Sequence, residues 1–173
     1  MAGPQGLRPH DVCVLLQLAL KPGLTFRELA SSVGLSLGEA HNSRKRLEAA
    51  GLLQEGNAPV NVSGTLEFLS SGVPYVFPSR LGSETRGVPT AFSAPPLSEQ
   101  IQSEESVVWP GVHGTVRGSS LEPLCPGAPE TRESNPDLYR LLTLVDGIRI
   151  GRAREKRLAL EQLESDLRGD DQP

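Results

Sequence analysis

The sequence contains few of the residues that usually identify a metal site or a disulfide-rich domain. It has two cysteines, Cys13 and Cys125, and aromatic residues make up only 4% of its 173 residues. Cys13 lies in an apolar run and Cys125 in a Pro-rich stretch, with no CxxC pair or Cys/His cluster. These spacings support neither a zinc site nor a disulfide framework, so we expect a chain in a reducing, cytoplasmic setting.

Long hydrophobic runs are also missing. The apolar run over residues 12–20 contains Gln17 and is too short to span a bilayer. Asp11 precedes it and no small-x-small cleavage motif follows, so we do not expect a secretory signal. We therefore expect no association with a membrane.

Common catalytic motifs are absent as well. There is no G-x-S-x-G, no P-loop and no His pair at metal-ligand spacing, and His10, His41 and His113 lie far apart in the chain. We expect no enzymatic activity, no cofactor and no metal. The net charge of −4 argues against bulk electrostatic binding to nucleic acid, but it leaves room for a local basic patch.

Glycine and proline, by contrast, are plentiful. The chain has 18 Gly and 15 Pro with 37% hydrophobic residues, which is lean for a single packed globule. We expect three regions: residues 1–60, residues 61–133 with a short helix and an extended Pro/Gly-rich segment, and a helical segment at 134–173. The expected fold class is mainly α with an irregular middle.

Helix signals are strongest in the first region. Pro9 and Asp11 suit the start of a helix whose apolar residues recur at helical spacing until Lys21-Pro22-Gly23 ends it. The stretch Thr25-Phe26-Arg27-Glu28 is typical of a capping box, in which a hydroxyl and a carboxylate satisfy orphan backbone N–H groups. It predicts a short helix that ends at Gly34.

A second helix-start signal follows eleven residues later. Ser36-Leu37-Gly38-Glu39 has the same capping-box pattern and predicts a helix to about Ala50, with Gly51 as its left-handed stop. Leu52 and Leu53 then predict the start of a strand.

The tight connection between these two helices is typical of a helix-turn-helix, whose second helix enters the DNA major groove. His41 and Asn42 are early enough in the helix to meet base edges, whereas the consecutive cations at 44–46 are placed for phosphates. The predicted DNA contacts are Thr25, Arg27, Ser36, Leu37, His41, Asn42, Arg44, Lys45 and Arg46. Two other interpretations stay open: the cations could form a solvated helix face, and the three helices could serve only protein contact.

Residues 10–56 resemble the winged helix-turn-helix of MarR-like bacterial regulators. The stretch VGLSLGEAHNSRKRLEAAGLL is similar to that family's recognition helix followed by the L-x-x-x-G-L entry to the wing. The resemblance implies a DNA-binding domain over residues 1–60, with a wing that starts at Leu52 and turns around residues 54–59. The segment YVFPSRLGSETRGVPTAFSAPPL resembles uncharacterised bacterial proteins with the same winged-helix start.

The sequence of the middle region predicts a helix near residues 63–71. Turns and extended segments should follow it, because repeated X-Pro steps forbid a long helix there. Its aromatic residues favour docking on another surface over disorder. Arg80 and Arg86 could bind phosphate or a partner carboxylate, or they could pair with Glu84 and cap turns.

The last region predicts helical structure from Ser134 to Leu167, weakened by Gly147 and Gly151. Its basic stretch GIRIGRAREKR could be a second DNA-facing element or a partner helix, and Leu160, Leu163 and Leu167 form a short apolar seam. The residues predicted to bind a partner protein are Arg80, Arg86, Arg149, Arg152, Leu160 and Leu163.

These patterns favour a sequence-specific transcriptional regulator that binds double-stranded DNA, acts as a repressor and forms a homodimer. The alternative is an antitoxin or regulatory subunit whose middle and C-terminal segments wrap a protein partner encoded nearby.

Overall fold

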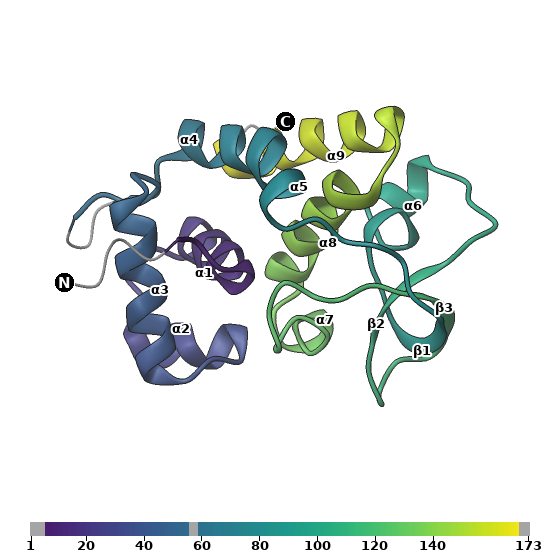
Figure 1. Ribbon diagram of the computed structural model, residues 1–173, viewed down its shortest axis with the longest axis horizontal. Coiled ribbons are helices and arrows are strands. Elements are labelled where there is room, and N and C mark those ends of the chain that lie inside the picture. The colour runs from purple at the N-terminus through teal and green to yellow at the C-terminus, as the bar shows by residue number, and fades with distance from the viewer. Residues whose placement is uncertain (1–5, 56–58, 170–173) are drawn as a thin grey trace.

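In the computed structural model, residues 6–55 and 59–169 are described. They form a mostly helical structure with one small three-stranded sheet. Figure 1 shows three helices from the N-terminal third at one end and the sheet towards the other, with later helices between them. No helix in these ranges is both long and apolar enough to cross a lipid bilayer.

The N-terminal end is built from α1 (Pro9–Leu20), α2 (Phe26–Val33) and α3 (Leu37–Ala49), as the capping signals predict. Gly34 ends α2 with a φ of 70°, a conformation that glycine adopts without steric cost. One side of α1 packs against α2 and α3, and its other side packs against α8. The resulting unit buries the apolar run of α1 almost completely.

A single antiparallel bridge between Leu53 and Val60 forms the base of the expected wing, and the amide of Asn61 donates to the carbonyl of Leu52 over 2.9 Å. The turn predicted around residues 54–59 includes residues 56–58, which lie outside the described residues.

The expected helix near residues 63–71 is longer than predicted and changes type along its length. It comprises α4 (Val62–Glu67), a π-helical segment η1 (Phe68–Gly72) and α5 (Val73–Val76). Asn61 caps it by accepting a hydrogen bond from the amide of Gly64 over 3.0 Å.

The extended pieces of the middle region are strands that pair with one another. They are β1 (Glu84–Pro89), β2 (Val107–Pro110) and β3 (Val116–Ser120). β1 is antiparallel to both others, with Val88 opposite Trp109 and Thr85 opposite Gly118, whereas β2 and β3 run parallel. Two short helical segments, η2 (Ala91–Ser93) and α6 (Leu97–Gln100), separate β1 from β2.

The C-terminal region consists of α7 (Thr131–Ser134), α8 (Pro136–Ile150) and α9 (Ala153–Arg168), with α8 and α9 packed together. Gly147 does not interrupt α8. A Cβ placed there would lie 2.6 Å from Cδ1 of Leu97 and 3.2 Å from Cβ of Ala159, so its missing side chain lets neighbouring elements approach. The helix ends instead at Gly151.

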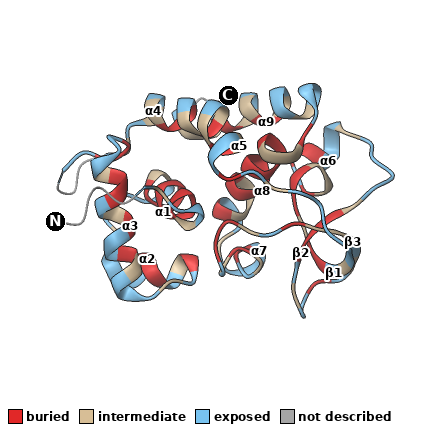
Figure 2. Cartoon of the chain, in the orientation of Figure 1, coloured by how far each residue is buried: buried red, intermediate tan, exposed pale blue. Residues whose placement is uncertain are grey.

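The two ends of the molecule share one hydrophobic core (Figure 2). The amide of Gly127 donates to the carbonyl of Val33 over 3.3 Å, which seats the 125–128 loop on the turn between α2 and α3. The side-chain Nδ2 of Asn135 donates to Oε1 of Gln17 over 2.7 Å. The helix-turn-helix is therefore anchored to the C-terminal region at several points.

Candidate nucleic-acid interface

A hydroxyl side chain caps the N-terminus of each helix of the helix-turn-helix, but the two caps differ. The hydroxyl of Thr25 accepts from the amide of Glu28 over 3.3 Å, and the Glu28 carboxylate accepts in return from the amide of Thr25 over 2.9 Å. The backbone N–H of Thr25 also lowers the pKa of Glu28. The predicted capping box at Thr25 is therefore present.

The second capping box is incomplete. The hydroxyl of Ser36 accepts from the amide of Glu39 over 3.2 Å. The Glu39 carboxylate, however, does not return to the Ser36 amide, because it accepts from Arg46 and lies beside His10 and Arg8. The prediction of a reciprocal box at Ser36 is wrong, since Glu39 joins α3 to α1 instead.

One side of α3 is exposed along its length. The residues on this side are Leu37, Gly38, His41, Asn42 and Lys45, at the spacing of one helix face. Leu37 at the first helical position is 54% exposed, although a leucine is usually buried. Figure 2 shows this side facing away from the rest of the molecule. A side of this kind is free to enter a groove.

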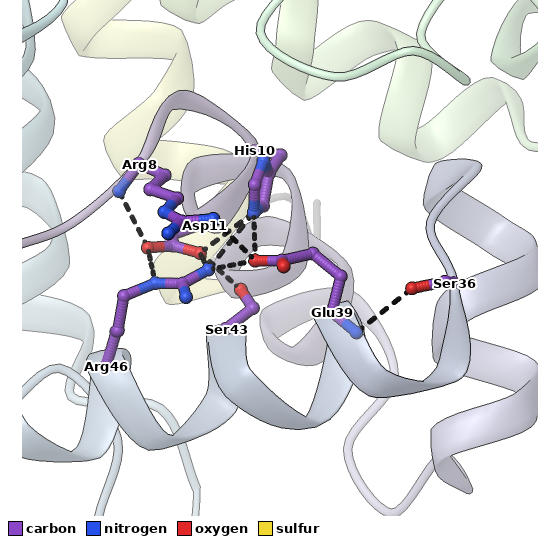
Figure 3. A network of polar contacts seen from close by, with 7 residues as sticks. All are labelled: Arg8, His10, Asp11, Ser36, Glu39, Ser43 and Arg46. Carbon is purple, nitrogen blue, oxygen red and sulfur yellow. Dashed lines mark hydrogen bonds and ion pairs between the residues drawn. The ribbon is translucent and has the colours of Figure 1, made fainter. Parts of the chain in front are cut away.

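The opposite side of α3 is fixed by a buried ion pair (Figure 3). The Asp11 carboxylate on α1, only 1% exposed, accepts from Nε of Arg46 over 2.8 Å and from Nη2 over 2.7 Å. It also accepts from the hydroxyl of Ser43 over 2.6 Å and from the amide of Arg8 over 2.8 Å. Four donors thus satisfy a carboxylate that would otherwise be costly to bury.

This geometry corrects the role predicted for Arg46. The guanidinium was expected to contact phosphate, but the residue is 6% exposed and its Nη2 donates to Glu39 over 2.6 Å as well as to Asp11. The hydrogen bonds to Asp11 raise the pKa of Arg46, and the hydrogen bond from Arg46 lowers the pKa of Glu39. The side chain is turned inward to hold α3 on α1.

Arg44 is also engaged within the protein. Its Nε lies 3.2 Å from Oε1 of Glu48, and its guanidinium carbon lies 5.9 Å from the centre of the Phe26 ring. The same ring meets the imidazole of His41 edge-on at a centroid distance of 4.9 Å. Phe26, which the sequence did not single out, therefore orients two of the predicted DNA contacts.

The remaining predicted contacts are all exposed at the helix starts or on α3: Thr25, Arg27, Ser36, Leu37, His41, Asn42 and Lys45. The structure places the start of α2 beside α3, because Phe26 contacts both His41 and Arg44. Their contacts with DNA stay predictions. The sequence identified Asp11 only as a residue that suits the start of a helix. The spacing of seven residues between Glu39 and Arg46 does indicate that these two side chains share a helix face.

Of the residues predicted to bind a partner, Arg149 and Leu163 face the interior. Leu163 is fully buried, and the Arg149 side chain is 5% exposed with Nη1 donating to Asp146 over 2.7 Å. These two residues are therefore not available to a partner protein in the way that the sequence predicted. Leu160 packs partly on the core, whereas Arg80, Arg86 and Arg152 are exposed. Glu84 pairs with Arg117 over 2.9 Å, which leaves the interpretation of Arg86 as its partner unsupported.

A second buried carboxylate, Asp146 on α8, organises the other end. It is 1% exposed and accepts from the hydroxyl of Thr90 and the indole N–H of Trp109, each over 2.7 Å, besides Arg149. Burial raises the pKa of Asp146 despite these donors. Through it the middle segment docks on its own chain. Among the described residues, no three His, Cys, Asp or Glu side chains gather as a metal site would require.

Comparison with known proteins agrees with this geometry. Residues 8–54 match a family described as winged helix-turn-helix DNA-binding. The match begins beside the Asp11 ion pair and ends within the base of the wing. These residues form a winged helix-turn-helix DNA-binding domain. Searches of curated proteins and of solved structures found no match to the chain.

Proposed function

We propose that this protein is a sequence-specific regulator of transcription that reads double-stranded DNA with α3 in the major groove. The observation that carries the proposal is the exposed side of α3, from Leu37 to Lys45. This helix is the second of the helix-turn-helix within a winged domain. A helix in this position reaches base edges with its N-terminal residues.

The side chains suggest a division of tasks. Asn42 has the two-atom amide that pairs with adenine, and Leu37 offers the apolar contact that suits a thymine methyl group. His41 is held beside them by Phe26. Lys45 and Arg27 provide charge for phosphates, and the amides at the start of α2 and α3, near Thr25 and Ser36, provide further phosphate donors.

Finer features of the proposal come from sequence resemblance and geometry. A single recognition helix reads only a few base pairs, so a homodimer on a two-fold site is expected. The resemblance of residues 33–53 to MarR-like recognition helices favours a cytoplasmic repressor of that type. The antitoxin alternative is less favoured, because the middle segment that motivated it is packed on its own α8 through Thr90 and Trp109.

The test begins with selection of duplexes from a random-sequence library by the full-length protein, followed by fluorescence anisotropy on the selected duplex. Asn42→Ala should relax base preference at one position, at a cost of about 1–3 kcal/mol for the preferred base. Lys45→Ala should weaken all sequences evenly and reduce the slope of log affinity against log salt by about 0.9.

Matched controls are the exposed Gln100→Ala on α6 and Arg117→Ala on β3. Both should bind like the wild type. Selection without enrichment, or affinities of the two α3 variants equal to those of the controls, would remove α3 from the mechanism.

A further inference from the structure

A second group of cations lies at the start of α9. Arg152, Arg154, Lys156 and Arg157 fall within six residues and are all exposed. Within residues 6–55 and 59–169, the one ion pair of this group joins Nε of Arg157 to Oε1 of Glu161 over 3.8 Å, and both side chains are more than half exposed. We refer to these four residues as the α9 basic cluster.

Helix stability accounts for only part of the charge pattern around the α9 basic cluster. The N-terminus of a helix carries a partial positive charge that disfavours cations, and its C-terminus disfavours acids. In α9, Glu155 in the first turn and Arg168 in the last turn follow this rule, whereas the cations at 154, 156 and 157 and the acids Glu161, Glu164 and Asp166 run against it. A charge order that opposes local stability is expected where a residue serves another purpose.

The acids of α9 have partners that explain them. Asp166 accepts from Nε of Arg140 on α8 over 2.6 Å, and Glu164 accepts from Nε of Arg168 over 2.9 Å. Arg152 takes part in a capping box with Glu155, whose carboxylate accepts from the Arg152 amide, whereas Arg154 and Lys156 have no comparable side-chain contact in the described part of the chain. The cations of the cluster are thus available to an external anion.

The cluster lies far from the exposed side of α3. Figure 1 places α3 at one end of the long axis and the junction of α8 and α9 in the other half of the molecule, with α1 between α3 and α8. Because α1 and α8 lie between them, we take a ligand of the cluster to be a segment separate from the one on α3.

The surroundings of the cluster favour a phosphate backbone over a protein. Protein interfaces rely on buried apolar and aromatic anchors, whereas phosphate contacts need only accessible cations. The large apolar side chains exposed among the described residues are Leu20, Phe26, Leu37, Tyr75, Val76, Leu81 and Val112, and none lies on α9.

We propose that the α9 basic cluster binds the phosphate backbone of a second segment of double-stranded DNA, without reading its sequence. The inference rests on the proposed function of α3, because a duplex held there brings the second segment within reach. The protein then links two DNA segments, one held by sequence and one by charge.

The experiment uses the full-length protein, a library-selected duplex fixed to beads, and a free fluorescent duplex of unrelated sequence. The wild type should capture the free duplex. Arg154→Gln/Lys156→Gln should reduce capture at least tenfold while still binding the selected duplex, and the salt slope of capture should fall by about 1.8 for the two lost contacts.

The matched control is Arg117→Gln/Arg168→Gln, which removes the same charge from exposed side chains outside the cluster. It should capture like the wild type. Equal losses in both double variants, unchanged capture by the cluster variant, or no capture by a wild type that binds the selected duplex would each overturn the inference and leave the role of α3 intact.

Two further readouts separate the remaining outcomes. Sedimentation should give the same assembly state for the wild type and both double variants. A cluster variant that dissociates would show that the partner is a second copy, which overturns the inference. Failure of the wild type to bind the selected duplex at all would instead overturn the proposed function.

Discussion

Among residues 6–55 and 59–169, each end of the molecule buries one aspartate, and the two aspartates have different kinds of partner. Asp11 joins α1 to α3 through Nε and Nη2 of Arg46 and the hydroxyl of Ser43. Asp146 joins α8 to the middle segment through one nitrogen of Arg149 and the neutral donors of Thr90 and Trp109. A bidentate guanidinium is the stronger and more directional partner.

The comparison shows how a single helix can be fixed on one side and left free on the other. The Asp11 pair uses one of the three consecutive cations of α3 to attach the helix to α1, while Lys45 remains exposed on the other side. At the other end, the hydrogen bonds accepted by Asp146 hold the sheet on α8. Its cationic partner, Arg149, stays inside the protein. The first network orients a candidate binding surface, whereas the second closes a core.

The largest expected effect comes from breaking the Asp11 network. Arg46→Ala leaves a buried carboxylate without its counter-ion and should lower the free energy of unfolding by about 3–5 kcal/mol. Its neighbour Lys45 is exposed, so Lys45→Ala should leave stability within about 0.5 kcal/mol and affect only DNA binding. Urea denaturation of both variants measures the contrast.

The double variant Asp11→Leu/Arg46→Met is the control for this prediction. Removing both charges leaves no uncompensated ion, so it should recover part of the loss. Equal stability of Arg46→Ala and Lys45→Ala would contradict the inward role assigned to Arg46.

A smaller effect is expected where the two ends meet. Gly34 and Gly51 both have positive φ, of 70° and 74°, but a Cβ on Gly34 would lie 2.8 Å from the amide nitrogen of Gly127 while one on Gly51 would meet nothing within 4 Å. Gly51→Ala should cost about 1–2 kcal/mol from backbone strain alone. Gly34→Ala should cost about 2–4 kcal/mol, because crowding of the 125–128 loop adds to that strain.

Thermal and urea unfolding of both alanine variants provide the measurement. Equal losses would mean that the loop yields freely and that the α2–α3 turn is not anchored to the C-terminal region.

The helix-turn-helix was largely predictable because its signals are local. Thr25, Glu28 and Gly34 determine helix ends through neighbours within a few residues, and the structure places those ends as expected. The role of Arg46 was not predictable in the same way, because its partner Asp11 lies 35 residues away. A run of three cations gives no indication of which one turns inward.

The middle segment was predicted least well for the same reason. Its prolines correctly excluded long helices, but strand pairing such as Val88 with Trp109 depends on contacts that no short window contains. The reading of its aromatic residues as docking groups holds for Trp109, which is buried, and fails for Tyr75, which is 81% exposed. Sequence indicated that the segment docks, without indicating that it docks on α8.

The smallest expected effect is a difference in pH dependence between the two ends. The pKa of Glu39 is lowered by Arg46, so its contribution to stability is present above the unfolded value of about 4.3 and is lost as pH falls through the folded pKa. The pKa of Asp146 is raised by burial, so above the unfolded value of about 3.9 the folded state binds more protons than the unfolded state. Stability therefore falls as pH rises from that value through the folded pKa.

Substitution by the neutral isostere isolates each contribution. The stability of the wild type minus that of Glu39→Gln should rise with pH across the acidic range, and the same difference for Asp146→Asn should fall. Each slope should stay below about 1.4 kcal/mol per pH unit, the limit for one proton. Urea titrations from pH 3 to pH 7 measure both curves. Slopes of the same sign would mean that the two ends do not differ in the pH dependence of these carboxylates. The Asp146 curve is the more informative, because its sign follows only if desolvation outweighs the three hydrogen bonds that the carboxylate accepts.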